Sequence, residues 1–418
     1  MLMKMLAISY FANETGMACS HHLDDRLPLL ADSGVEITLL TSIISRKNKK
    51  IRQIFAPSIF ASGLRFEIRS LLKRKNYKKW KYRLLETILT FPLLPFYYIE
   101  KMLFNIDTTW SWSFGAAFVG YLNCVRHSPT VIYSTGGPIS AHVAAGLISR
   151  WTGIPWIAEF QDPLIHSYCA RSNFELKLTL WAERFICKHA SRVVFLTRKA
   201  VDAASARTEL GARGLVIYPG AKRETLNVSY ESTGYLRFAH LGSLGGVRNL
   251  GYFLRGLEYL IQELPLLREQ VRVELYGGVG KDVRQQINDF LYKDMIRENG
   301  MIPREKCLEI MRKTDVLLLI QGADDVSKET IPSKAYEYLH AQRPILALVY
   351  GNEELKRMLK DLGHIPVDAS NECEIRDGIM AFVEKYNLGL MQENADQSPY
   401  TTEMAVQQLM DVVLTVTQ

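Results

Sequence analysis

The strongest constraint on the fold is a repeated alternation of short apolar segments and longer amphipathic segments. Apolar segments such as TVIYSTG and RVVFLT are short and rich in β-branched residues, which favours strands buried on both faces of a sheet. The segments between them, such as ISAHVAAGLISRWTG, have the length and periodicity of helices. Strands that alternate with helices predict an α/β fold with parallel sheets.

The alternation is interrupted once, at the polar and turn-rich segment from Pro219 to Gly234. It resumes with YLRFAHLGSLGG, includes a short strand expected at NGMI (residues 299–302), and ends in two helices. A chain of 418 residues is also too long for one core, because single cores rarely exceed about 250–300 residues. We therefore expect two Rossmann-like domains, at residues 1–218 and 234–398, followed by a C-terminal helix at 399–418.

The cysteines and the acidic residues give no sign of a metal or a disulfide framework. The six cysteines are scattered and form no CxxC pair, so we expect buried thiols in a reducing compartment. The adjacent Asp324 and Asp325 lie in an expected loop and do not form a convincing metal site. The N-terminus reads as a short strand and not as a signal peptide.

One block of the chain is strongly basic. From Arg46 to Arg83 there are 14 Lys and Arg but a single acid, Glu67, in a chain whose net charge is +7. The apolar segment Leu84–Ile99 follows, and it is too short and too interrupted for a spanning helix of about 20 residues. We expect the insertion Arg46–Asn105 to contact an anionic membrane surface. A solvated, partly disordered insertion is the competing interpretation, and no motif supports nucleic acid.

Two loops that follow expected strands contain glycine before a helix. The loop after the first strand has Gly16 but no GxGxxG motif, which argues against dinucleotide binding. The second loop, HLGSLGGVRNL, has Gly242, Gly245 and Gly246 before a helix expected from about Asn249. Backbone N–H groups in such a loop can face a phosphate, and Arg248 can neutralise it.

The segment ETIPSKAYEYLHAQRPILAL places two carboxylates on either side of a helix start. Pro332 suits a first helical position, so a helix is expected to begin near Ile331–Ser333. Glu329 then lies in the preceding loop and Glu337 lies within the helix. This separation does not suit a pair of acid and base carboxylates, but it suits an extended ligand with hydroxyls at both ends and an anion between them.

This segment resembles the E-x7-E segment of retaining GT-B glycosyltransferases similar to glycosyltransferase family 4. The resemblance covers most of the chain outside Arg46–Asn105. Other matching segments, in chain order, are VIYSTGGPISAHVAAGLISRWTGIPWIAEFQDP, ERFICKHASRVVFLT, LRFAHLGSLGGVRNL and MIPREKCLEIMRKTDVLLLI. It implies the GT-B fold, in which the two domains face each other across a cleft and the C-terminal helix returns to the N-terminal domain.

The resemblance also implies roles for individual residues. Glu329 and Arg248 would act at the reacting centre, on the donor sugar and on the diphosphate. The implied donor-binding residues are Gly242, Ser243, Ile331, Ser333, Lys334, Glu337, Gly277 and Pro303. The implied residues on the acceptor side of the cleft are Gly16, Met17, Gly136, Gly137, His142 and Asp162.

The sequence departs from the family pattern in two places. EFQDP replaces DFRDP, which removes a cation beside Glu159 and Asp162. The family's usual Arg/Lys pair is represented in its loop by Arg248 alone, so Lys334 is the candidate for the second cation. We expect no cofactor and no metal, because Arg248 and a helix N-terminus can stabilise the departing diphosphate.

The resemblance predicts a retaining glycosyltransferase that moves a sugar from a nucleoside diphosphate donor to a glycan acceptor, expected to be lipid-linked, in bacterial surface polysaccharide synthesis. It would work in the cytoplasm, at the inner face of the cytoplasmic membrane. A GT-B nucleotide-sugar epimerase and a non-catalytic membrane-bound scaffold are the alternatives. His142 and His240 border the expected site, but both are better explained as structural histidines.

Overall fold

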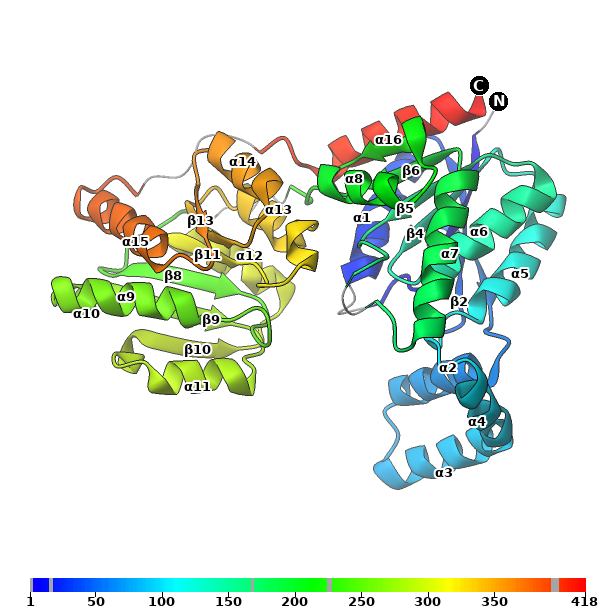
Figure 1. Cartoon of the computed structure of the whole chain (residues 1–418), viewed down its shortest axis with the longest axis horizontal. Helices are drawn as coiled ribbons and strands as arrows, with labels where there is room; N and C mark the ends of the chain where they lie inside the picture. Colours follow the sequence, from blue (N-terminus) through cyan, green and yellow to red (C-terminus); the bar gives the residue numbers. More distant parts are fainter. Residues whose placement is uncertain (1–2, 15–17, 167–168, 224–227, 392–397) are drawn as a thin grey trace. The chain divides into compact units, whose positions relative to one another are not determined.

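The chain forms two compact units, each built on one parallel sheet (Figure 1). The computed structural model describes residues 3–14, 18–166, 169–223, 228–391 and 398–418. Unit 1 consists of Met1–Pro219 with Thr402–Gln418, and unit 2 of Gly220–Thr401. The prediction of two Rossmann-like domains is therefore confirmed.

The sheet of unit 1 has seven strands in the order β3-β2-β1-β4-β5-β6-β7, and all of its pairings are parallel. Its strands are β1 (Lys4–Ile8), β2 (Glu36–Ser42), β3 (Arg52–Ala56), β4 (Val131–Gly136), β5 (Trp156–Phe160), β6 (Arg192–Phe195) and β7 (Gly214–Val216). Its helices are α1 (Ala18–Asp32), α2 (Ala61–Arg74), α3 (Lys79–Thr90), α4 (Leu94–Leu103), α5 (Trp112–His127), α6 (Ile139–Thr152), α7 (Asn173–His189), α8 (Arg198–Arg207) and α16 (Thr402–Thr417), with the short 3-10 helices η1 (Phe91–Leu93) and η2 (Gly211–Arg213).

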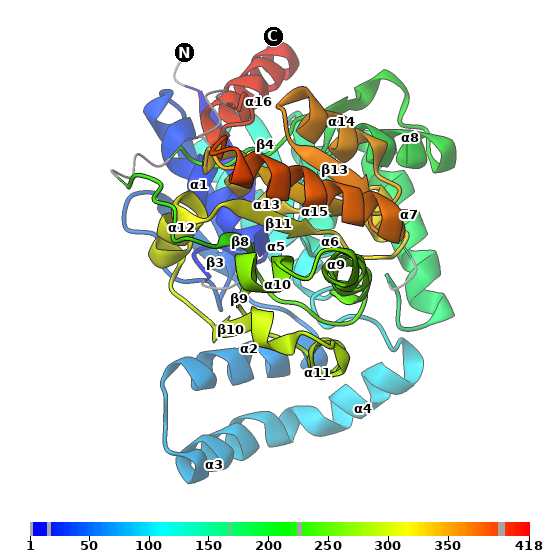
Figure 2. The same cartoon turned by 90° about the vertical axis from the view of Figure 1, so that its left-hand side faces the viewer.

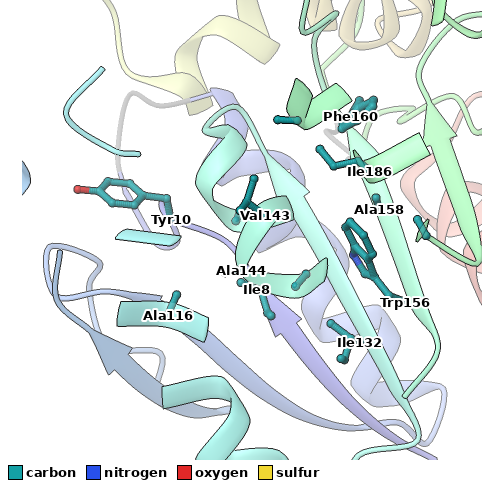
Figure 3. Packing of buried hydrophobic residues seen from close by; sticks show 14 of the residues in the cluster. Ile8, Tyr10, Ala116, Ile132, Val143, Ala144, Trp156, Ala158, Phe160 and Ile186 are labelled. Carbon is teal, nitrogen blue, oxygen red and sulfur yellow. The ribbon is translucent and has the colours of Figure 1, made fainter. Parts of the chain in front are cut away.

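Side chains alternate between the two faces of this sheet, and both faces are buried. Leu6 and Ile8 of β1 pack into a core with α5, α6 and α7, which Figure 3 shows around Trp156. Met5 and Ala7 of the same strand pack into a second core with α1 and α16. Successive strand residues point to opposite faces, so a strand covered by helices on both sides must be apolar throughout.

The basic insertion Arg46–Asn105 folds into the strand β3 and the helices α2, α3, η1 and α4. The helix α2 is followed by α3, η1 and α4, which run back beneath it (Figure 2). One buried carboxylate holds this hairpin to the unit, and a second joins α2 to α4 within it. Glu67 accepts hydrogen bonds from the Ser58 backbone N–H and from the Tyr10 hydroxyl, and Glu100 accepts one from the Ser62 N–H at 2.9 Å. None of the described helices is long and apolar enough to cross a membrane.

The sheet of unit 2 has six strands in the order β10-β9-β8-β11-β12-β13, again all parallel. Its strands are β8 (Leu236–Leu241), β9 (Val271–Tyr276), β10 (Ile296–Gly300), β11 (Val316–Ile320), β12 (Ile345–Val349) and β13 (Ile365–Asp368). Its helices are α9 (Gly251–Glu263), α10 (Leu267–Gln270), α11 (Lys281–Asp289), α12 (Arg304–Lys313), α13 (Ser333–His340), α14 (Glu353–Asp361) and α15 (Glu372–Asn387), with the 3-10 helices η3 (Lys293–Met295) and η4 (Val326–Lys328).

The expected boundaries were wrong in two places. The strand expected at residues 299–302 lies at Ile296–Gly300, because this edge strand is largely exposed and its polar sequence hides the pattern. The helix expected from Asn249 begins at Gly251, after a turn in which Gly245 and Arg248 pair with each other.

A buried ion pair joins three elements of unit 1. The Arg26 guanidinium from α1 contacts the Glu159 carboxylate of β5 at 2.6 Å, and the Tyr133 hydroxyl of β4 donates to the same carboxylate. All three side chains are almost fully buried. Glu159 therefore has a structural partner within its own unit.

We predict that Glu159→Gln lowers the free energy of unfolding of unit 1 by about 3–5 kcal/mol, because it leaves the Arg26 charge buried and unpaired. The measurement is urea denaturation followed by tryptophan fluorescence. Glu36→Gln is the control, since Glu36 forms an exposed pair with Lys4 and its loss costs about 1 kcal/mol or less. Equal effects of the two substitutions would contradict the prediction.

Candidate functional site

The candidate site in unit 2 lies at the carboxyl edge of its sheet. In the strand order, β8 lies next to β11, and the connections leave these two strands in opposite directions across the sheet. Ligands of doubly wound sheets bind outside the carboxyl ends of the strands at this position. The predicted donor-binding residues follow β8, β9, β10 and β11, so they belong to this edge.

The loops after β8 and β9 are held together through their backbones. The Gly242 N–H donates to the Tyr276 carbonyl at 2.7 Å, and the Leu244 N–H donates to the Gly278 carbonyl at 2.9 Å. Gly277 has a φ of 135°, and a Cβ placed on it would lie 2.3 Å from the Gly242 carbonyl oxygen. Glycine is therefore required at position 277, and the two loops form one rigid floor.

The loop after β11 joins the same floor. The Ala323 N–H donates to the Val247 carbonyl at 2.8 Å, next to Arg248. Val247 and Arg248 are exposed, so the backbone and not side-chain burial holds this turn in place. The loops of three strands, β8, β9 and β11, are thus fixed relative to one another.

Two buried amides position the turn that contains Glu329. The Gln321 side-chain amide donates to the Ser327 carbonyl at 2.5 Å and to the Thr330 carbonyl at 2.9 Å. The Asn352 amide donates to the same two carbonyls, both at 2.9 Å. Glu329 follows the 3-10 helix η4 directly, as expected for a residue in the loop before α13. The Gln321 and Asn352 side chains therefore fix the backbone on both sides of Glu329.

The acid next to this turn also has a structural partner. The Asp324 carboxylate accepts hydrogen bonds from the Ser327 N–H at 3.0 Å and from the Ser327 hydroxyl at 2.7 Å. The Asp324 carboxylate therefore binds Ser327 within η4. Among the described residues, no group of three or more His, Cys, Asp or Glu side chains is arranged to hold a metal ion.

The helix α13 begins at Ser333, with Pro332 as its N-cap. Pro332 has a φ of −63° and a ψ of 137°, so it is extended and stands just before the first helical position that we predicted for it. Glu337 lies four residues into the helix and is half-buried. The structure thus places Glu329 and Glu337 on opposite sides of a helix start.

Lys334 connects α13 to the glycine floor. A Cβ placed on Gly242 would lie 2.8 Å from Lys334 Cε, so the lysine stem lies directly over this glycine. The ammonium group is 3.8 Å from a Glu337 carboxylate oxygen. The other Glu337 oxygen is 3.5 Å from the Arg304 guanidinium, which follows the predicted residue Pro303.

The pKa of His240 responds to the positive charge around the Gly242 loop. Its side chain is buried and its Nδ1–H donates to the Leu318 carbonyl at 2.9 Å. Burial, together with the positive charges of Lys334 and Arg248, lowers the pKa of His240 to about 4. Both cations are therefore close enough to act on one imidazole, although they come from different loops.

The predicted residues of unit 1 that the structure describes lie at the ends of β4 and β5 and in α6. Gly136 ends β4 with a φ of 126° and lies against Ser9, and Gly137 follows it. His142 is fully buried in α6 and hydrogen-bonds through Nδ1 to the Ser134 hydroxyl at 2.8 Å. Burial lowers its pKa to about 4, so it is neutral and serves the core. Asp162 is exposed after β5.

The predictions for Gly16 and Met17 lie outside the described residues. Sequence reasoning also missed three residues of the site in unit 2: Arg304, Gln321 and Asn352. Only Arg304 could have been found, because a cation after a Pro at a helix start is visible in the sequence. The two amides could not have been found, because their role depends on burial, which the local sequence does not reveal.

Residues 30–220, just under half of the chain, match the model of the glycosyl transferase 4-like domain. Together with the two Rossmann-like sheets, this match supports the GT-B fold that the resemblance in the sequence predicted. A search of curated proteins finds no match.

Solved structures agree with this fold. The structure of Anabaena Alr3699/HepE in complex with UDP and glucose is 13% identical, with a TM-score of 0.63, and covers 99% of this chain and 100% of its own. TarM is 10% identical with a TM-score of 0.65, and each chain is covered to 99%. The lipopolysaccharide outer core galactosyltransferase WaaB is 11% identical with a TM-score of 0.61 and the same coverage.

We predict that His240 remains neutral down to about pH 4. An unfolded histidine titrates near 6.5, so the unfolded state binds more protons between these values. The stability that His240 contributes is therefore complete above pH 6.5 and is lost as the pH falls toward 4. The measurement is ring ¹⁵N NMR between pH 4 and 8. A midpoint near 6.5 would contradict the prediction, and Lys334→Met should raise the midpoint.

Proposed function

We propose that this glycosyltransferase moves a sugar from a nucleoside diphosphate donor to a glycan acceptor with retention of configuration. The observation that supports it best is the arrangement around Gly242. There, the cations Arg248 and Lys334 act on one imidazole, and Lys334 lies over a floor of backbone held by Gly277. An anion with two negative groups, such as a diphosphate, suits this combination.

The remaining residues extend this anion site in two directions. Glu337 lies one turn into α13 and would accept hydrogen bonds from the ribose hydroxyls. Glu329 lies in the loop before the helix and would contact the sugar. The N-terminus of α13, with Ser333 and the backbone near Ile331, and the turn of Ser243 would meet the diphosphate between them. This order reproduces the layout of a nucleotide sugar.

The chemistry required of the protein is stabilisation of charge. As the bond between the sugar C1 and the phosphate oxygen breaks, negative charge develops on the diphosphate. Arg248 and Lys334 are placed to stabilise it without a metal. The acceptor hydroxyl forms the new bond to C1 on the same face, and its proton goes to the departing phosphate oxygen. The known GT-B structure with UDP and glucose supports a UDP-sugar donor.

The acceptor in this proposal is a lipid-linked glycan of a bacterial surface polysaccharide, as the similarity to WaaB supports. The protein would work in the cytoplasm, bound to the inner face of the cytoplasmic membrane. The surface that supports membrane contact is an apolar stripe on α3, η1 and α4. It consists of Trp80, Leu84, Ile88, Phe91, Ile99 and Met102, which are 51–80% exposed.

Cations accompany this apolar stripe. The segment from Lys73 to Arg83, at the tip of the hairpin, contains seven Lys and Arg, and all seven are exposed. Apolar side chains beside a cluster of cations are typical of helices that lie in the interface of an anionic bilayer. The hairpin offers both within 30 residues of chain.

We predict that Arg248→Met and Lys334→Met each weaken UDP binding roughly tenfold to a hundredfold, because each removes a charge-assisted hydrogen bond. The measurement is isothermal titration calorimetry. Lys313→Met is the matched control, because Lys313 pairs with Glu309 on the exposed face of α12. This variant should bind UDP with the affinity of the wild type.

Turnover gives a second readout in the same experiment. Glu329→Gln should keep UDP affinity and lose transfer of the sugar, which is followed by product analysis with a labelled UDP-sugar. Unchanged transfer by Glu329→Gln would reject the assignment of this residue. A UDP-sugar converted to its epimer, without transfer, would identify an epimerase, and binding without either reaction would identify a scaffold.

We predict that Ile88→Asp with Met102→Asp reduces binding to vesicles of anionic phospholipid roughly tenfold or more, because it puts two charges into the apolar stripe. Vesicle sedimentation measures this. Val125→Asp is the control, since Val125 is 62% exposed on α5, outside the hairpin. Wild-type protein that does not sediment, or equal sedimentation of the three proteins, would reject membrane contact through the stripe.

A further inference from the structure

An apolar groove opens beside the apolar stripe. It has a volume of about 380 Å³ and lies between the start of α2 and the helices η1 and α4. Its walls are formed by Ile59, Phe60, Leu64, Phe96, Ile99 and Leu103. Phe96 is 66% exposed and Leu103 is 59% exposed, so large apolar side chains remain in contact with water at its mouth. Such exposure points to a ligand or a partner.

The groove is formed by close packing and hydrogen bonds within the hairpin. Its one charged lining residue, Glu100, is buried and is occupied by the Ser62 N–H and hydroxyl. Behind it, Gly63 allows α2 to approach the Ser58 and Ser111 side chains so closely that a Cβ would come within 2.6 Å of each. The Glu100 carboxylate is therefore satisfied inside the protein, and the other residues that line the groove are apolar.

Two features of the surroundings select a lipid as the occupant. Ile99 belongs both to the groove and to the apolar stripe, so the groove opens where the stripe would meet a bilayer. The cations of the segment from Lys73 to Arg83, at the other end of the hairpin, favour an anionic surface. An amphipathic peptide helix could also use an apolar groove, but it would not need this charge.

We propose that the groove takes one hydrocarbon chain of an anionic glycerophospholipid when the hairpin lies on a bilayer. This proposal rests on the membrane contact proposed above and adds a specific site to it. Burial of the chain between α2 and α4 removes Phe96, Ile99 and Leu103 from water together with the lipid methylenes. The lipid headgroup then stays at the interface, as part of the anionic surface that the cations of the hairpin favour.

The test uses the full chain with vesicles of phosphatidylglycerol that carry a photoreactive diazirine at the end of one acyl chain. After irradiation and proteolysis, mass spectrometry locates the labelled residues. We expect labels on Leu64, Phe96 and Leu103 of the groove as well as on the stripe. In Leu64→Trp, whose larger side chain fills the groove, the groove labels should be lost while vesicle binding persists.

Matched controls separate the outcomes. Val125→Trp adds the same side chain outside the hairpin and should leave the labels unchanged. Vesicle binding with labels on the stripe alone would overturn the groove and leave membrane contact intact. No vesicle binding would overturn both, and groove labels that persist in Leu64→Trp would overturn the assignment of the lipid chain. Groove labels that are equally strong on neutral vesicles would also overturn it, because the proposal requires an anionic lipid.

Discussion

All strand pairs in both sheets are parallel, so the carboxyl ends of neighbouring strands lie along one edge of each sheet. In a parallel sheet the loops at this edge come from segments that are far apart in sequence. In unit 2 they are joined by backbone hydrogen bonds from Gly242 to Tyr276 and from Ala323 to Val247. Every group of the candidate donor site depends on this edge, because it holds Arg248, Lys334 and Glu329 in place.

The fold could be predicted from the sequence because its signals are local. Short β-branched segments, helical segments and the turn-rich segment after Pro219 determined two α/β units. Pro332 located the start of α13 within one residue, since its fixed φ suits only the first positions of a helix. The edge strand β10 was misplaced, because burial, which produces the apolar pattern, is weak there.

The site could be predicted only in part. The residues that follow the strands could be named as candidates from the sequence, but their mutual geometry depends on tertiary contacts. Lys334 over Gly242 and the two amides under the Glu329 turn illustrate this, since no spacing in the chain brings them together. The helices of the basic insertion were missed for another reason. Their apolar side chains face solvent, so the pattern does not show which face is buried.

The two surfaces of this molecule have complementary tasks in the proposed reaction. The edge of unit 2 offers fixed cations and backbone N–H groups to a diphosphate, whereas the hairpin of unit 1 offers apolar side chains and cations to a bilayer. The donor site and the membrane surface use different residues, so an experiment can reject one without rejecting the other. A lipid-linked acceptor is the substrate that would need both.

The most direct test of the central claim is a crystal structure of the protein with UDP. We expect the diphosphate to lie on the Gly242 turn, with its oxygens within hydrogen-bond distance of Arg248 and Lys334, about 3 Å. The ribose hydroxyls should then contact Glu337. A nucleotide bound away from the carboxyl edge of β8 and β11, or a diphosphate that touches neither cation, would contradict it.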